Sequence, residues 1–156
     1  MILVKASIRP SPIEGLGLFV EEMVDRGRLV AIYTHDETIL PEKDYTDLIK
    51  AGDELAARTG CRWIGHLCIY NQTRMEDEDY INHSNEPSLL YHCGVFFARR
   101  DMKSGEELTV DYKYILAEKE PGFIDKITGQ AIQGLTGREA MIQSARELVF
   151  LLENNN

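Results

Sequence analysis

The stretch from residue 79 to residue 114 constrains the fold of this chain more than any other. It opens with Asn-His-Ser at 82–84, followed by the helix-hostile Asn-Glu-Pro at 85–87. It closes with Gly-Glu-Glu-Leu-Thr-Val-Asp-Tyr at 105–112, a turn that leads into a short β-prone run. Residues 94–99 between them are rich in β-branched and aromatic side chains, which predicts a strand. Two polar turns joined by a strand predict a pocket built on a sheet.

Further short strands are predicted in the first half of the chain. Apolar runs bounded by turn residues cover 2–8, 14–20, 29–33 and 62–70. The second run contains Gly15-Leu16-Gly17, and glycine inside a strand marks either a bulge or a close approach of another backbone or a ligand. Both interpretations of this Gly-X-Gly remain open at this point.

Two helices are expected outside the strands. Residues 41–58 place their apolar side chains on one side, although Gly52 weakens such a helix by ~1 kcal/mol. Residues 137–153 carry apolar side chains at helical spacing, and Thr136 with Glu139 forms a capping box in front of them. We expect the second helix to be amphipathic and to pack on the β-rich body.

Length and composition predict a single globular domain. The chain has 156 residues, of which 44% are hydrophobic and 28% charged, and the short strands predict a mainly β, α+β class. We expect a body at 1–115 and a C-terminal segment at 116–156 that packs on it. The net charge of −9 disfavours direct nucleic-acid binding. No apolar run approaches the ~20 residues that span a bilayer, so we expect an intracellular protein without a membrane partner.

The cysteines and histidines predict neither a disulfide framework nor a metal site. The three cysteines are odd in number and irregularly spaced, which predicts buried reduced thiols. The four histidines fit no helix-borne ligand pair, so a metal hydrolase is disfavoured. In chain order these residues are His35, Cys61, His66, Cys68, His83, His92 and Cys93.

Three motifs together resemble the SET domain of protein-lysine methyltransferases. Glu-Gly-Leu-Gly-Leu-Phe at 14–19 looks like the family's N-terminal GxG motif, and Asn-His-Ser and Gly-Glu-Glu-Leu with Asp-Tyr follow in the family's order. The resemblance covers roughly residues 3–115. It implies a β-clip fold of several small sheets, in which the Asn-His-Ser segment threads under the final tyrosine's segment as a pseudoknot. Many members close the site with a cysteine cluster, but no cysteine follows Cys93 here, so something else must do so.

The resemblance implies an enzyme that transfers a methyl group from S-adenosylmethionine to the side-chain amine of a lysine in a basic protein or tail. Tyr112 would be the catalytic residue, with its hydroxyl near the transferred methyl. The implied cofactor-binding residues are Glu14, Gly15, Leu16, Gly17, Asn82, His83, Tyr112 and Phe123. The implied walls of the lysine channel are Tyr33, Tyr70, Val110 and Tyr114.

Methyl transfer of this kind is an in-line displacement, which needs orientation more than a strong base. Holding the reactants in line contributes roughly 7–11 kcal/mol. A lysine amine, whose pKa is about 10.4 in water, must react uncharged, and burial beside a sulfonium lowers that pKa. A hydroxyl and backbone carbonyls can then align the amine. Val110 leaves room for several methyl groups, but Tyr70 would restrict the channel, so we expect mainly monomethylation.

Two questions have alternative answers at the level of sequence. The four carboxylates of residues 76–79 form either a solvated loop or the approach for a Lys- or Arg-rich substrate. The alternative function is a SET-fold protein that binds a peptide or the cofactor without catalysis. The presence of Tyr112 favours the enzyme.

Overall fold

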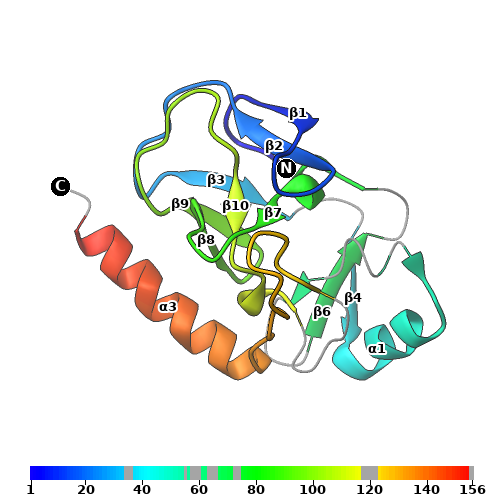
Figure 1. Ribbon diagram of the computed structural model, residues 1–156. Helices are drawn as coiled ribbons and strands as arrows, with labels where there is room; N and C mark the ends of the chain where they lie inside the picture. The colour runs from blue at the N-terminus through cyan, green and yellow to red at the C-terminus, as the bar shows by residue number, and fades with distance from the viewer. Residues whose placement is uncertain are drawn as a thin grey trace.

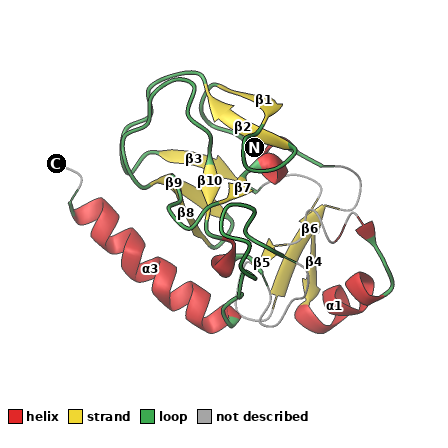
Figure 2. Cartoon of the chain, in the orientation of Figure 1, coloured by secondary structure: helices red, strands yellow, loops and turns green. Residues whose placement is uncertain are grey.

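The computed structural model describes residues 1–33, 37–54, 56, 61–62, 67–71, 75–116 and 123–154. In this part of the chain, short strands form three small sheets, and helices α1 and α3 lie at the periphery (Figures 1 and 2). The expected class, mainly β with several small sheets and two helices, is confirmed.

The strands pair within three sheets. β1 (Ala6–Pro10) pairs antiparallel with β2 (Leu16–Val20). The five-stranded sheet has the order β3 (Leu29–Ile32), β9 (Val95–Ala98), β8 (Leu89–His92), β10 (Thr109–Val110) and β7 (Asn82–His83). The third sheet has the order β4 (Glu37–Pro41), β6 (Leu67–Asn71) and β5 (Cys61–Arg62). The helical elements are α1 (Glu42–Lys50), η1 (Asp77–Tyr80), η2 (Tyr112–Tyr114) and α3 (Gly137–Glu153).

Strand β10 joins segments that are distant in the sequence. It lies between β7 and β8 and runs parallel to both, with Thr109 opposite Asn82 and Val110 opposite His83. The Ser84 N–H also donates to the Val110 carbonyl at 3.1 Å. Because β10 directly precedes the Asp-Tyr pair, this pairing brings the Asn-His-Ser and Asp-Tyr motifs side by side. The resemblance predicted this proximity.

The turn at 105–108 fastens β2 to the rest of the body. The Leu108 N–H donates to the Leu18 carbonyl at 2.7 Å, and the Val20 N–H donates to the Glu106 carbonyl at 3.0 Å. Leu18, Val20 and Leu108 belong to the main hydrophobic core and are at most 1% exposed. Because water cannot replace buried backbone partners, these bonds hold the Gly-X-Gly strand in one register.

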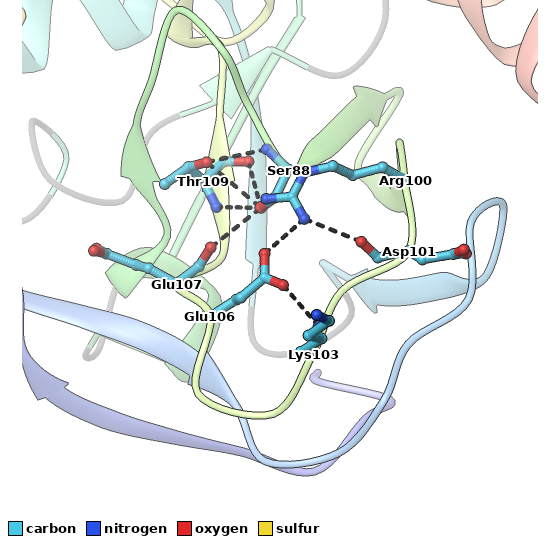
Figure 3. A network of polar contacts seen from close by, with 7 residues as sticks. All are labelled: Ser88, Arg100, Asp101, Lys103, Glu106, Glu107 and Thr109. Atoms are coloured by element: carbon cyan, nitrogen blue, oxygen red, sulfur yellow. Dashed lines mark hydrogen bonds and ion pairs between the residues drawn. The ribbon is translucent and has the colours of Figure 1, made fainter.

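Ser88 is a buried polar anchor beside this turn. Its Oγ accepts from the Thr109 N–H at 2.9 Å, and its own N–H donates to Thr109 Oγ1 at 3.0 Å (Figure 3). Nearby, Arg100 pairs with Glu106 at 2.6 Å, and Glu106 accepts from the Lys103 N–H at 2.8 Å (Figure 3). The Lys103 and Arg100 donors lower the pKa of Glu106. Polar contacts thus hold the turn on two sides.

Helix α3 starts at the predicted capping box, in which the Thr136 hydroxyl accepts from the Glu139 N–H at 3.2 Å. We expected the apolar residues at helical spacing in this helix to face the body, and this expectation is partly wrong. Three of them, Ile142, Val149 and Leu152, are 39%, 55% and 50% exposed. The buried residues are Ala140, Ser144 and Leu151. Small side chains let the helix approach β8 and η2 closely, so shape outweighs apolar character here.

The predicted helix at 41–58 is a shorter helix, α1, which ends at Lys50. Gly52 follows it with a φ of +84°, a left-handed conformation that ends helices and that glycine adopts without a steric penalty. Gly52 therefore follows the end of the helix, whereas the sequence predicted a glycine inside a weakened helix.

Two predicted strands have different bounds in the structure. The run at 62–70 is divided between β5 and β6, which pair antiparallel to each other, and residues 63–66 lie outside the described residues. The run at 2–8 is replaced by a strand at 6–10, and Ile2 forms only an isolated bridge with Ala31. Apolar alternation gave the type of these elements but not their ends.

We predict that the docking of α3 weakens as the pH falls through about 6.5. His92 Nδ1 contacts Ser144 Oγ at 2.8 Å, and burial lowers the pKa of His92 below its ordinary value of 6.5. As the pH falls, His92 therefore binds a proton in the unfolded chain before it does so in the folded chain. The free energy of unfolding is then highest above about pH 6.5 and decreases below it. Melting temperatures measured between about pH 7.5 and about pH 5.5 check this.

In this experiment His92→Gln is expected to flatten the pH dependence. Ser144→Ala is the control, because it removes the hydrogen-bond partner but leaves a titrating imidazole in place. An equal slope for His92→Gln and the parent chain would contradict the assignment to His92.

Candidate functional site

One cavity gathers most of the predicted site residues. Its volume is about 620 Å³, which lies within the range of small-molecule sites. Its walls come from the β1–β2 loop, from η1 and β7, from β10 and η2, and from residues 123–132. The predicted residues that line it are Glu14, Gly15, Leu16, Tyr33, Asn82, His83, Val110, Tyr112 and Phe123.

The Gly-X-Gly loop presents its backbone to this cavity. Gly15 has a φ of +52°, and a Cβ added there would meet no atom within 4 Å. The Ser11 N–H donates to the Gly15 carbonyl at 2.9 Å, and Ser11 Oγ accepts from the Ile13 N–H at 2.9 Å. Gly15 is therefore required by the turn, and the space beside it is open to a ligand.

Asn82 ties the second motif to this loop. Its amide nitrogen donates to the Leu16 carbonyl at 3.1 Å and to Glu107 Oε1 at 2.8 Å, and the Glu14 carbonyl lies 3.3 Å away. The same Glu107 oxygen accepts from Ser11 Oγ at 2.7 Å. One carboxylate oxygen thus connects the Gly-X-Gly loop, the Asn-His-Ser motif and the Gly-Glu-Glu-Leu turn.

Gly17 makes room for that carboxylate and does not line the cavity. A Cβ added at Gly17 would lie 2.2 Å from Glu107 Oε1 and 3.0 Å from the Ser11 Cβ. The prediction that Gly17 contacts the cofactor therefore does not match its place in the structure. The second glycine of the motif permits the close approach of a side chain of this chain, whereas the sequence predicted either a bulge or the approach of another backbone or a ligand.

Tyr112 is held at both ends within the cavity. Its N–H donates to His83 Nδ1 at 3.2 Å, and its hydroxyl donates to the Ile81 carbonyl at 3.0 Å. Burial raises the pKa of Tyr112 well above its usual range, and the negative charges of Glu14, Asp79 and Glu107 add to this. The phenol therefore stays neutral at physiological pH, and its lone pairs are left for another group because its proton is engaged.

His83 carries a buried nitrogen that has no hydrogen-bond partner among the described residues. The ring is 7% exposed, and its Nδ1 accepts the bond from the Tyr112 backbone. In the neutral imidazole the proton is then on Nε2, which is the nitrogen without a partner. A buried donor without an acceptor costs about 1–3 kcal/mol, so this N–H favours a ligand that brings an acceptor into the cavity.

A hairpin-like segment at 123–132 forms the remaining wall. The Ile132 N–H donates to the Phe123 carbonyl at 2.9 Å, and the Phe123 ring lies 6.1 Å from the ring of Tyr112 in an edge contact. Lys126 pairs with Glu14 across the cavity rim at 3.0 Å. This segment follows the Asp-Tyr pair and contains no cysteine, so residues other than cysteine form this wall of the cavity.

The predicted channel residues divide into two groups. Tyr33 and Val110 line the cavity. Tyr114 does not line the cavity, and its hydroxyl donates to the carboxylate of Glu147 on α3. The prediction that Tyr114 forms a wall of the channel therefore does not match its place in the structure. For Tyr70 only the backbone in β6 is described, opposite Thr38, and its side chain lies outside the described residues. The predicted control of product by Tyr70 stays a prediction.

The acidic run at 76–79 is neither a plain solvated loop nor a row of free carboxylates. Residues Glu76 and Asp79 cap η1 reciprocally, and Glu78 is 3% exposed and pairs with the amino group of Met1. Asp77 is the exposed member of the run, and Glu76 and Asp79 are partly buried. Sequence could not give the buried ion pair of Glu78, because it depends on a tertiary contact with Met1.

Several lining residues were not predicted from the sequence. They include Tyr80, Ile81, Phe96 and Lys126, while Glu78 and Asp79 belong to the acidic run that was considered as a substrate approach. No role was predicted for Glu107 from the sequence. In the structure its carboxylate accepts hydrogen bonds from Asn82 and Ser11, and a charged acceptor of this kind makes strong hydrogen bonds. The signal available was the place of Glu107 in the Gly-Glu-Glu-Leu motif, a few residues before the Asp-Tyr pair.

A mainly β body that brings a Gly-X-Gly loop, an Asn-His pair and an Asp-Tyr pair around one cavity defines a SET fold. The family model described as SET domain matches residues 15–113, more than half of the chain. The chain therefore belongs to the SET domain family. A search of curated proteins gave no significant match.

Three further features concern the part of the chain that the structure describes. Among the described residues, no group of three or more His, Cys, Asp or Glu side chains could hold a metal ion. No described helix is long and apolar enough to cross a membrane. Cys68 and Cys93 are free thiols.

We predict that Gly17→Ala destabilises the chain by about 1–3 kcal/mol, because the added methyl group must displace the Glu107 carboxylate from its donors. Chemical denaturation measures this loss. The double variant Gly17→Ala/Glu107→Asp is expected to recover part of it, since the shorter side chain withdraws from the clash. A Gly17→Ala variant as stable as the parent would contradict the close approach.

Proposed function

We propose that this SET-fold protein is an S-adenosylmethionine-dependent protein-lysine N-methyltransferase. The observation that carries the proposal is the Tyr112 hydroxyl, held by the Ile81 carbonyl in a cavity that the Gly-X-Gly and Asn-His motifs also line. The family to which the chain belongs generally comprises protein-lysine methyltransferases. A neutral, oriented hydroxyl suits a reaction that needs alignment more than base strength.

The residues around the cavity fit S-adenosylmethionine. The backbone at Glu14 and Leu16 and the open space at Gly15 suit its methionine part, while the unpartnered His83 N–H offers a donor. Asn82 would act mainly by holding the loop, and Phe123 offers an aromatic face. When bound, this cofactor supplies a methyl group on a positively charged sulfur. The acidic side chains at Glu14 and Asp79 suit that charge.

The chain's own residues would orient the lysine amine. The Tyr112 oxygen and the Ile81 carbonyl are acceptors that can align an amine N–H, and both come from segments tied to the core. Tyr112 is not a base in this scheme, because its raised pKa keeps it protonated and a neutral phenol accepts protons poorly. The amine loses its proton to solvent before it reacts, and desolvation in the cavity favours that loss.

The proposed substrate is a lysine in a basic protein or tail. The described lining residues include three carboxylates, of which Glu14 pairs with Lys126 and Glu78 with the amino group of Met1, while the third is Asp79. The net charge of −9 favours encounter with basic partners, and this steering weakens as salt rises. Incubation with labelled S-adenosylmethionine and a mixture of basic proteins tests activity and substrate together. Binding of the cofactor without transfer would favour the non-catalytic alternative.

We predict that S-adenosylmethionine raises the melting temperature and that Asn82→Ala removes most of the rise. A ligand at about a hundred times its dissociation constant adds ~2.7 kcal/mol, or about 5–10 °C for a domain of this size. Asn154→Ala is the matched control, because Asn154 is exposed at the end of α3. No shift at millimolar cofactor would overturn the cofactor assignment.

We predict that Tyr112→Phe lowers kcat about 10²-fold while leaving the cofactor-induced thermal shift nearly intact, because the hydroxyl acts mainly in the transition state. Tyr114→Phe is the matched comparison. It loses only the bond to Glu147, so it is expected to lower stability more than turnover. Full activity of Tyr112→Phe would show that this hydroxyl is not catalytic.

A further inference from the structure

A second hollow, called here the basic groove, lies between α3 and the body of the protein. It has a volume of about 310 Å³ and shares no residue with the cavity of the proposed active site. Leu90 and Leu151 form its buried floor, and Phe150, 65% exposed, forms part of its wall. The charged residues that line it are Arg26, Arg99, Arg146 and Glu147.

The basic groove carries positive charge in a chain whose net charge is −9. Arg99 and Glu147 form an ion pair and neutralise each other. Arg146 is exposed and has no ion pair or hydrogen bond among the described residues. Arg26 donates through Nη1 to the Asn154 carbonyl at 3.3 Å, but its Nε is buried and has no acceptor. Two guanidinium groups thus lack an anion, and one N–H lacks any acceptor.

An apolar stripe continues from the groove along the outer face of α3. Ile142, Arg146, Val149 and Phe150 follow the spacing i, i+4, i+7 and i+8, which places them on one face of a helix. The apolar members are 39%, 55% and 65% exposed in chain order. A small anion would cover the groove and leave this stripe in water. The occupant therefore needs both acidic groups and an extended apolar surface.

We propose that the basic groove and this stripe bind an acidic protein segment that carries apolar side chains. Its carboxylates pair with Arg26 and Arg146, and its apolar side chains cover Val149 and Phe150. A flat anionic membrane fits less well, since Arg26 is recessed and the net charge of the chain repels such a surface. The partner is opposite in charge to the proposed lysine-rich substrate, so this site does not depend on the proposed function.

The test uses short fluorescein-labelled peptides of Asp, Glu, Leu and Phe, in helical and extended designs, and the full chain. We expect binding by fluorescence anisotropy, and amide shifts in NMR spectra confined to the groove and stripe. The double variant Arg26→Gln/Arg146→Gln is expected to weaken binding roughly tenfold or more, because both charge-assisted contacts are lost. Phe150→Ser is expected to weaken it several-fold.

Ile39→Ser is the matched control, since Ile39 is 47% exposed on β4, in another sheet, and belongs to neither the groove nor the stripe. It should leave binding unchanged. Arg99 and Glu147 are not used, because Glu147 also anchors Tyr114. Melting temperatures show whether each variant is folded.

Four results with the peptides or with phosphate would overturn the proposal. They are no binding by either peptide design, equal binding by the double variant, equal binding by acidic peptides with Ser in place of Leu and Phe, and the same amide shifts with inorganic phosphate alone. Binding to vesicles of anionic lipid in preference to the peptides would assign the surface to a membrane and also overturn it.

Discussion

The candidate site depends on the hydrogen bonds that the Glu107 carboxylate accepts. One of its oxygens accepts from Ser11 and from Asn82, and it occupies the space that the missing side chain of Gly17 leaves. Because a carboxylate makes stronger hydrogen bonds than a neutral acceptor, this oxygen can hold segments that are distant in the sequence. The Gly-X-Gly loop therefore takes its shape from the other two motifs, and none of the three forms the cavity wall alone.

A second set of contacts fixes the segment that carries Tyr112. His83 and Ile81 hold the residue itself, while Tyr114 in the same short helix donates to Glu147 on α3. Side-chain contacts therefore hold η2 on two sides, one toward the cavity and one toward α3. A helix that touches the cavity nowhere still limits the movement of a cavity residue, because η2 lies between them.

The sequence was informative where local chemistry decides structure and less so where tertiary contacts do. The order of short strands, the capping box at Thr136 and the nearness of the Asn-His and Asp-Tyr motifs follow from local pattern and family resemblance. The place of Tyr114 could not be predicted in this way, since the same local sequence is compatible with a tyrosine that faces a cavity and with one that faces a helix. Likewise, the burial of Glu78 depends on the position of Met1, which lies far away in the sequence.

The two hollows differ in charge, and Glu147 stands between them. One Glu147 oxygen accepts from Tyr114 beside the acidic cavity, and the other pairs with Arg99 in the basic groove. An anion that contacts only Arg26 and Arg146 leaves this chain of contacts intact and does not disturb Tyr112. An anion that also takes Arg99 competes with Glu147 for it. Coupling between two binding sites is reciprocal, so if this competition changes the affinity for a ligand at the cavity, that ligand changes the affinity at the groove by the same factor.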